Sequence, residues 1–386
     1  MSDFKNYFTD GKPQCAFNYY FYVYVYLLKL CSPPSDQFKH LIGYILIPGP
    51  PDDIFKEVPL QLENYPEPDY QDLNDAMEKF ELKILQATKT ENEGIVPPEE
   101  TEVIYDEMCL VLEDLTDLMT NNPNNAYAFL KRKGVDRIIL PNLSIAYPHL
   151  RNHLLSLTKV LFDIAPVSTK AMTPNFMVDK LLDIYETSDV GLKNHVLDIL
   201  MMWLPDNPKL QTRIVKFKGM NVFYSQLDKL DAYGIHSLLE LFNTILLEHL
   251  IARDELSAQK SKADFDKFNL YQKIGLIEHV STPAVCKGLL NMFASAWPAV
   301  MKDDEVVIPM LEIIKNTKEY CLYNYIGRKS GNKAVGLFEN LLKYIVDNKD
   351  KWDSVLAVNV NVTEYEPVLQ DYIEQLKPPA AVKEDL

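Results

Sequence analysis

Two histidines have the spacing that comes closest to a metal site. In His149-Leu-Arg-Asn-His153 the imidazoles lie one helical turn apart, so both can reach a single zinc ion. The general-base glutamate of H-E-x-x-H is missing, and no third ligand is evident. His236 and Glu240 repeat the spacing on another predicted helix. Polar residues spaced in this way are typical of a solvated helix face, so we predict no metal site.

The sequence contains no motif for nucleotide chemistry or acyl transfer. It has no G-x-G-x-x-G, no G-x-x-x-x-G-K-[ST] and no G-x-S-x-G, and the run Gly327-Arg-Lys-Ser-Gly331 lacks the P-loop spacing. The five cysteines form no C-x-x-C pair and are too scattered for a disulfide scaffold. Three of them, Cys109, Cys286 and Cys321, lie among apolar helix residues, and we expect them to pack there as small hydrophobic side chains. We therefore predict neither an enzyme nor a bound cofactor.

Composition and charge exclude several further classes of protein. The 386 residues are 47% apolar and 24% charged, which is enough to build a large core. Only 13 are glycine, about half the usual ~7%, so collagen-like, sandwich and doubly wound folds are disfavoured. The net charge of −16 repels phosphate polyanions, and the longest basic run is Lys131-Arg132-Lys133. Nucleic acid is not an expected partner.

Residues 1–68 are predicted to lie outside the main domain. An apolar, aromatic run within residues 16–32 is too short to span a membrane but fits the apolar part of a secretory signal. The alternative is a buried strand, because aromatic residues alternate through the run. Eight of the 24 prolines then fall between Pro33 and Pro68, which indicates an extended linker.

The opposite end of the chain also bears on location. The tail, residues 378–386, ends in Lys383-Glu384-Asp385-Leu386, which is similar to the K-D-E-L class of retrieval signals. Asn142 and Asn361 begin glycosylation sequons. These features predict a protein of the endoplasmic reticulum (ER) lumen with no membrane span.

Between these ends, residues 69–377 are predicted to be all-α. Apolar residues recur every three or four positions, and a pattern of proline followed by glycine repeats along the chain. Gly134 follows Pro123 by eleven residues, and Gly219 follows Pro208 by eleven; Pro166 lies between, 43 and 42 residues from the other two prolines. This period is that of armadillo and HEAT repeats, so we predict a helical solenoid of that type.

Each repeat makes sense as three helices. Proline can open the first, because its missing N–H is not needed there. Glycine then permits the turn into the second, and a long third helix follows in 150–164, 192–204 and 235–250. The charged segment 252–267 is expected to be an exposed insertion or an extended helix. Apolar periodicity resumes in atypical closing helices at 271–280, 285–293, 307–314, 334–345 and 368–376.

In such a solenoid the third helices line the concave face, which is where these proteins bind partners. A 42-residue offset aligns polar positions on the three long helices into rows, which we interpret as a binding surface. The alternative is that these residues simply form the solvent-exposed side of ordinary amphipathic helices. The candidate partner-binding residues are Asn152, Ser156, Lys159, Asp163, Asn194, Asp198, His236, Glu240 and Asn243.

Residues 206–227 resemble a known repeat signature, N-P-x-x-Q…G, which Asn207, Pro208, Gln211 and Gly219 match. The signature is that of armadillo-like nucleotide exchange factors of heat shock protein 70 chaperones, a family with ER-luminal and cytosolic members. The resemblance covers residues 100–325, and the acidic chain and its KEDL ending favour the luminal member. The middle repeat, Ala165-Pro166-Val-Ser-Thr-Lys170, departs from the signature because it has neither the asparagine before the proline nor the glutamine three residues after it.

The resemblance implies a co-chaperone that binds the nucleotide-binding domain of the luminal chaperone BiP and promotes ADP release. Its concave face would stabilise an opened form of that domain, and no catalytic side chain is needed. The alternatives are the cytosolic relative that binds heat shock protein 70, a cytosolic armadillo scaffold for peptide or protein partners, and a metalloenzyme at His149 and His153.

Overall fold

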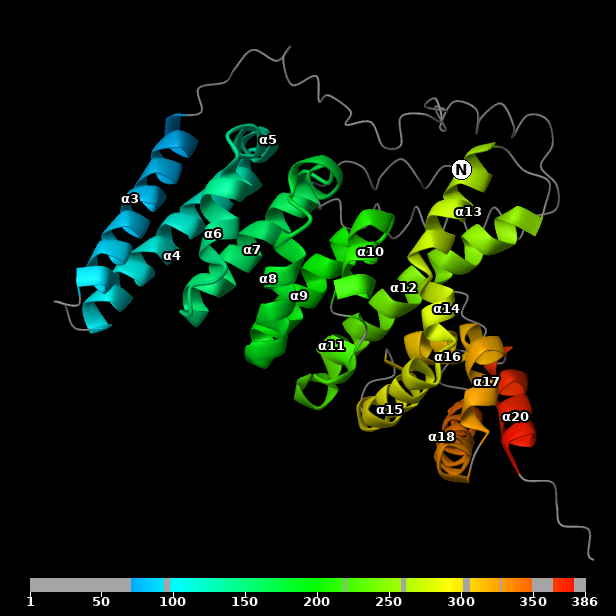
Figure 1. The fold of residues 1–386 in the computed structure, drawn as a ribbon. Coiled ribbons are helices and arrows are strands. Elements are labelled where there is room, and N and C mark those ends of the chain that lie inside the picture. Colours follow the sequence, from blue (N-terminus) through cyan, green and yellow to red (C-terminus); the bar gives the residue numbers. More distant parts are fainter. Residues whose placement is uncertain are drawn as a thin grey trace, which may run out of the picture. The chain divides into compact units, whose positions relative to one another are not determined.

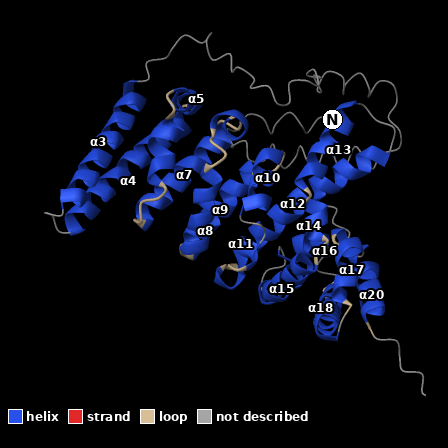
Figure 2. Cartoon of the chain, viewed as in Figure 1, coloured by secondary structure: helices blue, strands red, loops and turns tan. Residues whose placement is uncertain are grey.

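The computed structural model describes residues 71–93, 98–217, 219, 221–257, 262–300, 306–326, 328–348 and 364–377. Every regular element within these ranges is helical and none is a strand, which confirms the all-α prediction (Figure 2). All of them belong to one compact unit, Leu60–Leu386. The apolar run 16–32, the proline-rich linker and the tail 378–386 lie outside the described residues.

A row of long helices runs through this unit. Each helix of the row contacts the next one, from α3 to α4, then α7, α9, α12 and finally α16 (Figure 1). The bounds are α3 Gln71–Glu93, α4 Pro98–Asn121, α7 Pro148–Ile164, α9 Val190–Trp203, α12 Ala232–Ser257 and α16 Val307–Asn316. The three predicted long helices therefore exist as α7, α9 and α12. Helix α12 continues to Ser257, so the first part of the charged segment 252–267 is an extension of this helix.

Shorter elements connect the members of this row and pack beside them. The α-helices are α5 Pro123–Lys131, α6 Leu140–Asn142, α8 Met177–Thr187, α10 Pro208–Phe217, α11 Asn221–Tyr224 and α13 Lys262–Ile274. Two π-helical turns, η4 Val135–Ile139 and η5 Ser168–Met172, and a 3₁₀ turn, η6 Leu227–Lys229, complete the set. Short helices followed by one long helix are the pattern expected of the repeat.

The Asn-Pro pairs start helices as the sequence predicts. Pro123 is the first residue of α5, and the side chain of Asn122 accepts a hydrogen bond from the Asn124 amide at 3.1 Å. Pro208 opens α10 in the same way, with the Leu210 amide donating to Asn207 Oδ1 at 3.3 Å. Each asparagine satisfies an amide that the first helical turn leaves without a partner.

The middle repeat differs, and there the prediction that proline opens an α-helix is wrong. Pro166 is followed by the single π-helical turn η5. The turn stops because Thr173 is extended, with φ −98° and ψ 122°, as the proline that follows it requires. The α-helix of this repeat, α8, begins only at Met177.

The two repeat glycines serve different purposes. Gly219 has φ +66°, so it supplies the left-handed turn expected after α10. Gly134 is right-handed at φ −58°, and the left-handed residue is its neighbour Lys133, so the predicted turn role is wrong there. A Cβ on Gly134 would lie 2.4 Å from the ring of Phe129. Gly134 is required by close packing and not by the turn.

The C-terminal helices contain a feature that the cysteine pattern did not predict. They are α14 Leu276–Val280, α15 Pro283–Val300, α17 Lys318–Tyr325, α18 Arg328–Asp347 and α20 Tyr365–Leu376. Cys286 of α15 and Cys321 of α17 form a disulfide, and both are buried. The expectation that these two residues pack as separate small hydrophobes is therefore wrong. Cys109 is a free, buried cysteine, and burial raises its pKa to about 11.

One hydrophobic cluster extends from Leu73 on α3 to Ile373 on α20. Its largest fully buried side chains include Trp203, Tyr185 and Tyr325. Trp203 also donates its indole N–H to the Thr169 carbonyl of η5 at 2.8 Å. The core is thus continuous through the described residues. The long helices carry polar residues at the positions that the core leaves partly or fully exposed.

Candidate functional site

The predicted partner-binding residues lie on three successive long helices of the row. Asn152, Ser156, Lys159 and Asp163 belong to α7, Asn194 and Asp198 to α9, and His236, Glu240 and Asn243 to α12. Helix α9 contacts both α7 and α12, so these residues occupy neighbouring helices. Asn152, Asp163 and Glu240 are exposed, and the others are partly buried. We call this set, with the residues hydrogen-bonded to it and the neighbouring pair His153 and Glu113, the polar face.

A network at the centre of the polar face joins the three helices. The Lys159 ammonium forms an ion pair with Asp198, whose side chain is only 13% exposed. The other carboxylate oxygen of Asp198 accepts a hydrogen bond from the Tyr233 hydroxyl at 2.6 Å. This hydrogen bond is the main reason that the pKa of Tyr233 is raised, with burial and the charge of Asp198 adding to it. Asp198 therefore fixes a lysine from α7 and a tyrosine from α12.

A second contact holds the start of α12 against α9. Asn194 Nδ2 donates to both carboxylate oxygens of Asp231, at 3.1 and 3.2 Å. Asp231 in turn accepts a hydrogen bond from the Gly234 amide at 2.8 Å, which caps α12. A Cβ on Gly234 would lie 2.4 Å from Asn194 Oδ1, so the glycine permits this close approach.

The remaining contacts extend the polar face along the row. His236 Nε2 lies 3.2 Å from Glu240 Oε2 within α12, and His153 Nε2 lies 3.7 Å from Glu113 Oε1 of α4. Asn243 accepts a hydrogen bond from the side chain of Asn316 on α16 at 3.1 Å. The polar face therefore touches every long helix from α4 to α16.

The contacts do not follow the 42-residue offset used to align the sequence. Lys159 and Asp198 are 39 residues apart, Asn194 and Asp231 are 37 apart, and Asp198 and Tyr233 are 35 apart. Packed helices cross at an angle, and side chains point toward the N-terminal end of their helix. A residue therefore meets one that lies several positions short of its repeat equivalent.

Charge on the polar face is mostly negative. Glu113, Asp163, Asp231 and Glu240 are exposed carboxylates, whereas the cation Lys159 is already paired with Asp198. Beside this pair, burial and then the charge of Lys159 lower the pKa of His195. An acidic face with fixed hydrogen bonds suits a basic protein surface better than a small substrate.

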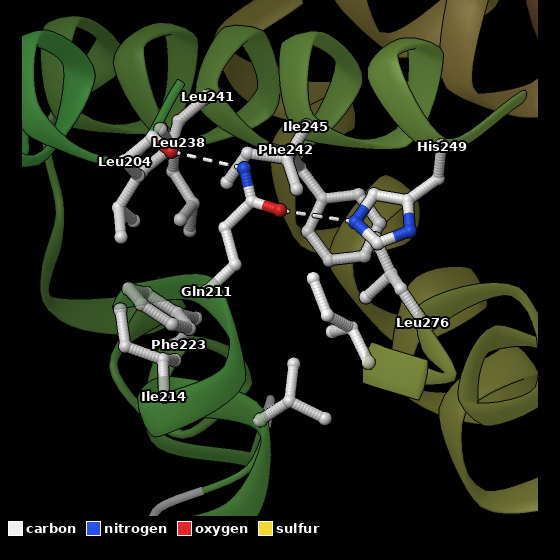
Figure 3. Close-up of a pocket in the computed structure, with 12 residues that line it drawn as sticks. Leu204, Gln211, Ile214, Phe223, Leu238, Leu241, Phe242, Ile245, His249 and Leu276 are labelled. Atoms are coloured by element: carbon white, nitrogen blue, oxygen red, sulfur yellow. Dashed lines mark hydrogen bonds between the residues drawn. The ribbon is translucent and has the colours of Figure 1, made fainter. Parts of the chain in front are cut away.

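A buried polar cluster behind α12 provides a contrast (Figure 3). Gln211 of α10 donates to the Leu204 carbonyl at 2.9 Å and to Glu248 at 2.9 Å, and its oxygen accepts from His249 at 3.0 Å. Glu248 also accepts hydrogen bonds from the Tyr271 hydroxyl at 3.2 Å and the Asp206 amide at 3.0 Å. These residues tie α10, α12 and α13 together.

Burial controls the protonation of this cluster. It raises the pKa of Glu248 and of Tyr271, and it lowers the pKa of His249 to about 4. The adjoining cavity, of about 40 Å³, is lined by apolar side chains that include Phe223, Phe242 and Leu276. Ligand sites usually measure several hundred Å³. We assign the cluster and the cavity to the packing of the core.

The structure also bears on the other predicted sites. Asn142 is buried, and its Nδ2 donates to the Ile138 carbonyl at 2.6 Å, so a glycan at this nitrogen is incompatible with the fold. Asn361 and the tetrapeptide Lys383 to Leu386 lie outside the described residues. No group of three or more His, Cys, Asp or Glu residues that could hold a metal ion occurs in the part of the chain that the structure describes.

One stretch of the described chain, Ala232–Asp254 within α12, is long and apolar enough to cross a membrane by length and composition. Such a stretch is weak support for a membrane span, because the core helix of a soluble protein has the same properties. Half of its apolar window is buried inside the protein, against α9, α13, α15 and α16.

The sequence analysis did not identify several residues that make important contacts in the structure. Tyr233 and Asp231 lie just before His236, and extending the predicted row toward the start of α12 would have included them. Cys286 and Cys321 are 35 residues apart, within the range at which residues of neighbouring helices meet elsewhere in the chain. Lys193, which donates from inside the core to the Tyr185 carbonyl and to Gln226 Oε1, carried no sequence signal at all.

Comparison with known proteins adds no relative: no family model matches the chain, and no curated protein or solved structure is significantly similar to it. The resemblance carried by residues 206–227 therefore stays a prediction from those residues. Function has to be argued from the polar face itself.

Proposed function

We propose that the described helices form an armadillo- or HEAT-like solenoid and that the chain is a nucleotide exchange factor for the ER-luminal heat shock protein 70 chaperone BiP. In this proposal the polar face on α7, α9 and α12 is the concave side of the solenoid. It binds the nucleotide-binding domain of the chaperone and favours the opened form, from which ADP leaves. The chain itself performs no catalytic chemistry.

The observation that carries the proposal is the network of Lys159, Asp198 and Tyr233 across three successive helices. Repeated units are expected to present one continuous surface to a partner, and here that surface is polar, acidic and fixed in place by its own hydrogen bonds. Surfaces that are ordered before binding lose less conformational entropy on association. An acidic surface is also attracted to basic patches on a partner.

The signature residues of the resemblance support the same proposal. Asn207 and Pro208 start α10, Gln211 ties it to α9 and α12, and Gly219 provides the left-handed turn that follows. Asn125 in the first repeat makes an equivalent contact, since its side chain donates to the Leu118 carbonyl at 2.7 Å, seven residues back, as Gln211 does to Leu204. In both repeats an amide side chain near the start of the short helix thus attaches it to the long helix before it.

The disulfide supports the ER lumen as the location. Disulfides persist in oxidising compartments and are rare in the cytosol. Cys286 and Cys321 are both fully buried, which suits a structural bridge. Thiol labelling of the protein extracted from cells should therefore find Cys109 reduced and the other two blocked; a chain with both of these thiols reduced would contradict the luminal location.

The activity is tested by stopped-flow release of a fluorescent ADP analogue from BiP, with the full chain added at increasing concentration. We expect release to accelerate and to saturate. Glu240→Lys, on the polar face, should raise the half-saturating concentration about tenfold because it opposes a basic partner. Glu374→Lys on α20, an exposed glutamate away from that face, is the matched control and should act like the wild type.

The outcome against the proposal is equally clear. If a folded, helical chain leaves ADP release unchanged at every concentration, the chain is not an exchange factor for this chaperone. The acidic polar face would then belong to a scaffold with a different partner.

A further inference from the structure

The polar face presents one large aromatic side chain to solvent. Tyr233, in the first turn of α12, is 53% exposed although its hydroxyl is engaged. The predicted rows contain no phenylalanine, tyrosine or tryptophan, so Tyr233 was not among the candidate residues. An exposed tyrosine at the centre of an interface is among the side chains that contribute most to binding.

The ring of Tyr233 is held in position before any partner arrives. Its hydroxyl donates to Asp198 at 2.6 Å, and Asp198 is itself fixed by Lys159. Two residues earlier, Asp231 is fixed by Asn194 and caps α12 through the Gly234 amide. Both the side chain and the helix turn that carries it are therefore ordered in the free protein, which lowers the entropic cost of using the ring as a contact.

Within the described part of the chain, several other tyrosine rings have a cation over them and Tyr233 has none. A lysine nitrogen lies 5.3 to 5.8 Å from the ring centroids of Tyr185, Tyr271, Tyr365 and Tyr372. Among the residues that the structure describes, no lysine or arginine takes that place at Tyr233. The ammonium of nearby Lys159 is engaged by Asp198, at the hydroxyl end of the ring. The ring of Tyr233 therefore remains exposed to solvent among the described residues.

The charge around the ring favours a cation too. Glu240 is an exposed carboxylate on the same side of α12, seven residues or about two helical turns after Tyr233, and its charge contributes to the raised pKa of Tyr233. A guanidinium or ammonium group above the ring would therefore gain from the ring and from this carboxylate together.

We propose that Tyr233 is the anchor of the polar face and that it receives an arginine or lysine side chain from the nucleotide-binding domain of the chaperone. This inference rests on the proposed exchange activity and adds the residue that determines affinity. The cation lies on the exposed ring face, with the Glu240 carboxylate on the same side of α12. Asp198 and Lys159 act as positioning residues, because they hold the ring and do not touch the cation.

The test compares substitutions that separate the ring from its hydroxyl. In the ADP-release assay with the full chain, Tyr233→Ala should raise the half-saturating concentration at least tenfold. Tyr233→Phe keeps the ring and should change it by less than about threefold, whereas Tyr233→Leu keeps apolar bulk without a π face and should behave like the alanine variant. Circular dichroism melts establish that each variant is folded.

Tyr323→Ala is the matched control, because Tyr323 on α17 is 76% exposed and lies outside the polar face. It should leave the half-saturating concentration unchanged. If the wild type accelerates release and Tyr233→Leu binds as well as the wild type, the cation–π contact is wrong while the exchange activity stands. If the wild type does not accelerate release, both proposals fail.

Discussion

The protein contains two networks in which a carboxylate holds a tyrosine hydroxyl, and they differ in one respect. Glu248 accepts from Tyr271 in the core, and Asp198 accepts from Tyr233 on the polar face. In the first network burial is the largest cause of the raised tyrosine pKa; in the second it is the hydrogen bond itself. Similar chemistry therefore serves two purposes, depending on the water around it.

This difference has energetic consequences. A buried carboxylate loses its hydration and depends on its donors, so each donor that is removed leaves an unsatisfied group in the core. Asp198 is 13% exposed and keeps Lys159 as a partner, so it can replace the Tyr233 donor with water at a smaller cost. The buried cluster should thus control stability, and the partly exposed network should control binding with less effect on stability.

The largest effect is expected for Gln211→Leu. This change removes two donated hydrogen bonds and the acceptor for His249, and it should lower the free energy of unfolding by about 3–4 kcal/mol. Urea denaturation followed by circular dichroism measures it. Gln370→Leu, an exposed glutamine on α20, is the control and should cost less than about 0.5 kcal/mol. If Gln211→Leu lowers the free energy of unfolding by less than about 1 kcal/mol, the buried cluster does not control stability as proposed.

A pH titration examines the same cluster. The pKa of His249 is about 4 in the folded chain and near 6.5 when unfolded. The folded state binds the proton less well, so the contribution of His249 is complete above pH 6.5 and is lost as the pH falls toward 4. The raised pKa of Glu248 acts in the opposite direction over the acidic range.

Comparison with His249→Gln isolates the histidine, because Glu248 and Tyr271 are present in both proteins. The stability advantage of the wild type should shrink by up to about 3 kcal/mol between pH 7 and pH 4. Denaturant melts at intervals across this range provide the measurement. A difference that stays constant with pH would show that His249 does not titrate as its burial requires.

A pair of identical substitutions compares the two networks directly. Tyr271→Phe removes a donor from buried Glu248 and should cost about 1–2 kcal/mol. Tyr233→Phe removes a donor from Asp198, which retains Lys159 and access to water, and should cost less than about 0.5 kcal/mol. Equal costs for the two variants, measured in the same urea series, would contradict the division.

The smallest effect is expected for Lys159→Ala. The ion pair with Asp198 is partly exposed, so its loss should lower the free energy of unfolding by less than about 1 kcal/mol. Most of that loss should disappear at 1 M salt, where exposed charges are screened. A larger or salt-independent loss would place this pair with the buried cluster.

Helical periodicity and the Asn-Pro pairs were sufficient to predict the all-α class and several of the helices. The starts of α5 and α10, and the long helices α7, α9 and α12, follow from local signals, because a cap and an apolar stripe act within a few residues. The prediction for the start of the middle repeat was wrong. Its proline lies close to a second one at Pro174, which restricts Thr173 and limits the segment to a single π-helical turn.

What the sequence determined by itself is therefore the helical class and, through the Asn-Pro pairs, the starts of α5 and α10. The tertiary structure decided which residues of the helices meet. It brought Asp198 to Tyr233 over 35 residues and joined Cys286 to Cys321 over the same distance. It also placed the Phe129 ring against Gly134, so that two equivalent glycines differ in purpose. Local signals end at the helix surface, whereas these contacts depend on the angle and offset at which one helix packs on the next.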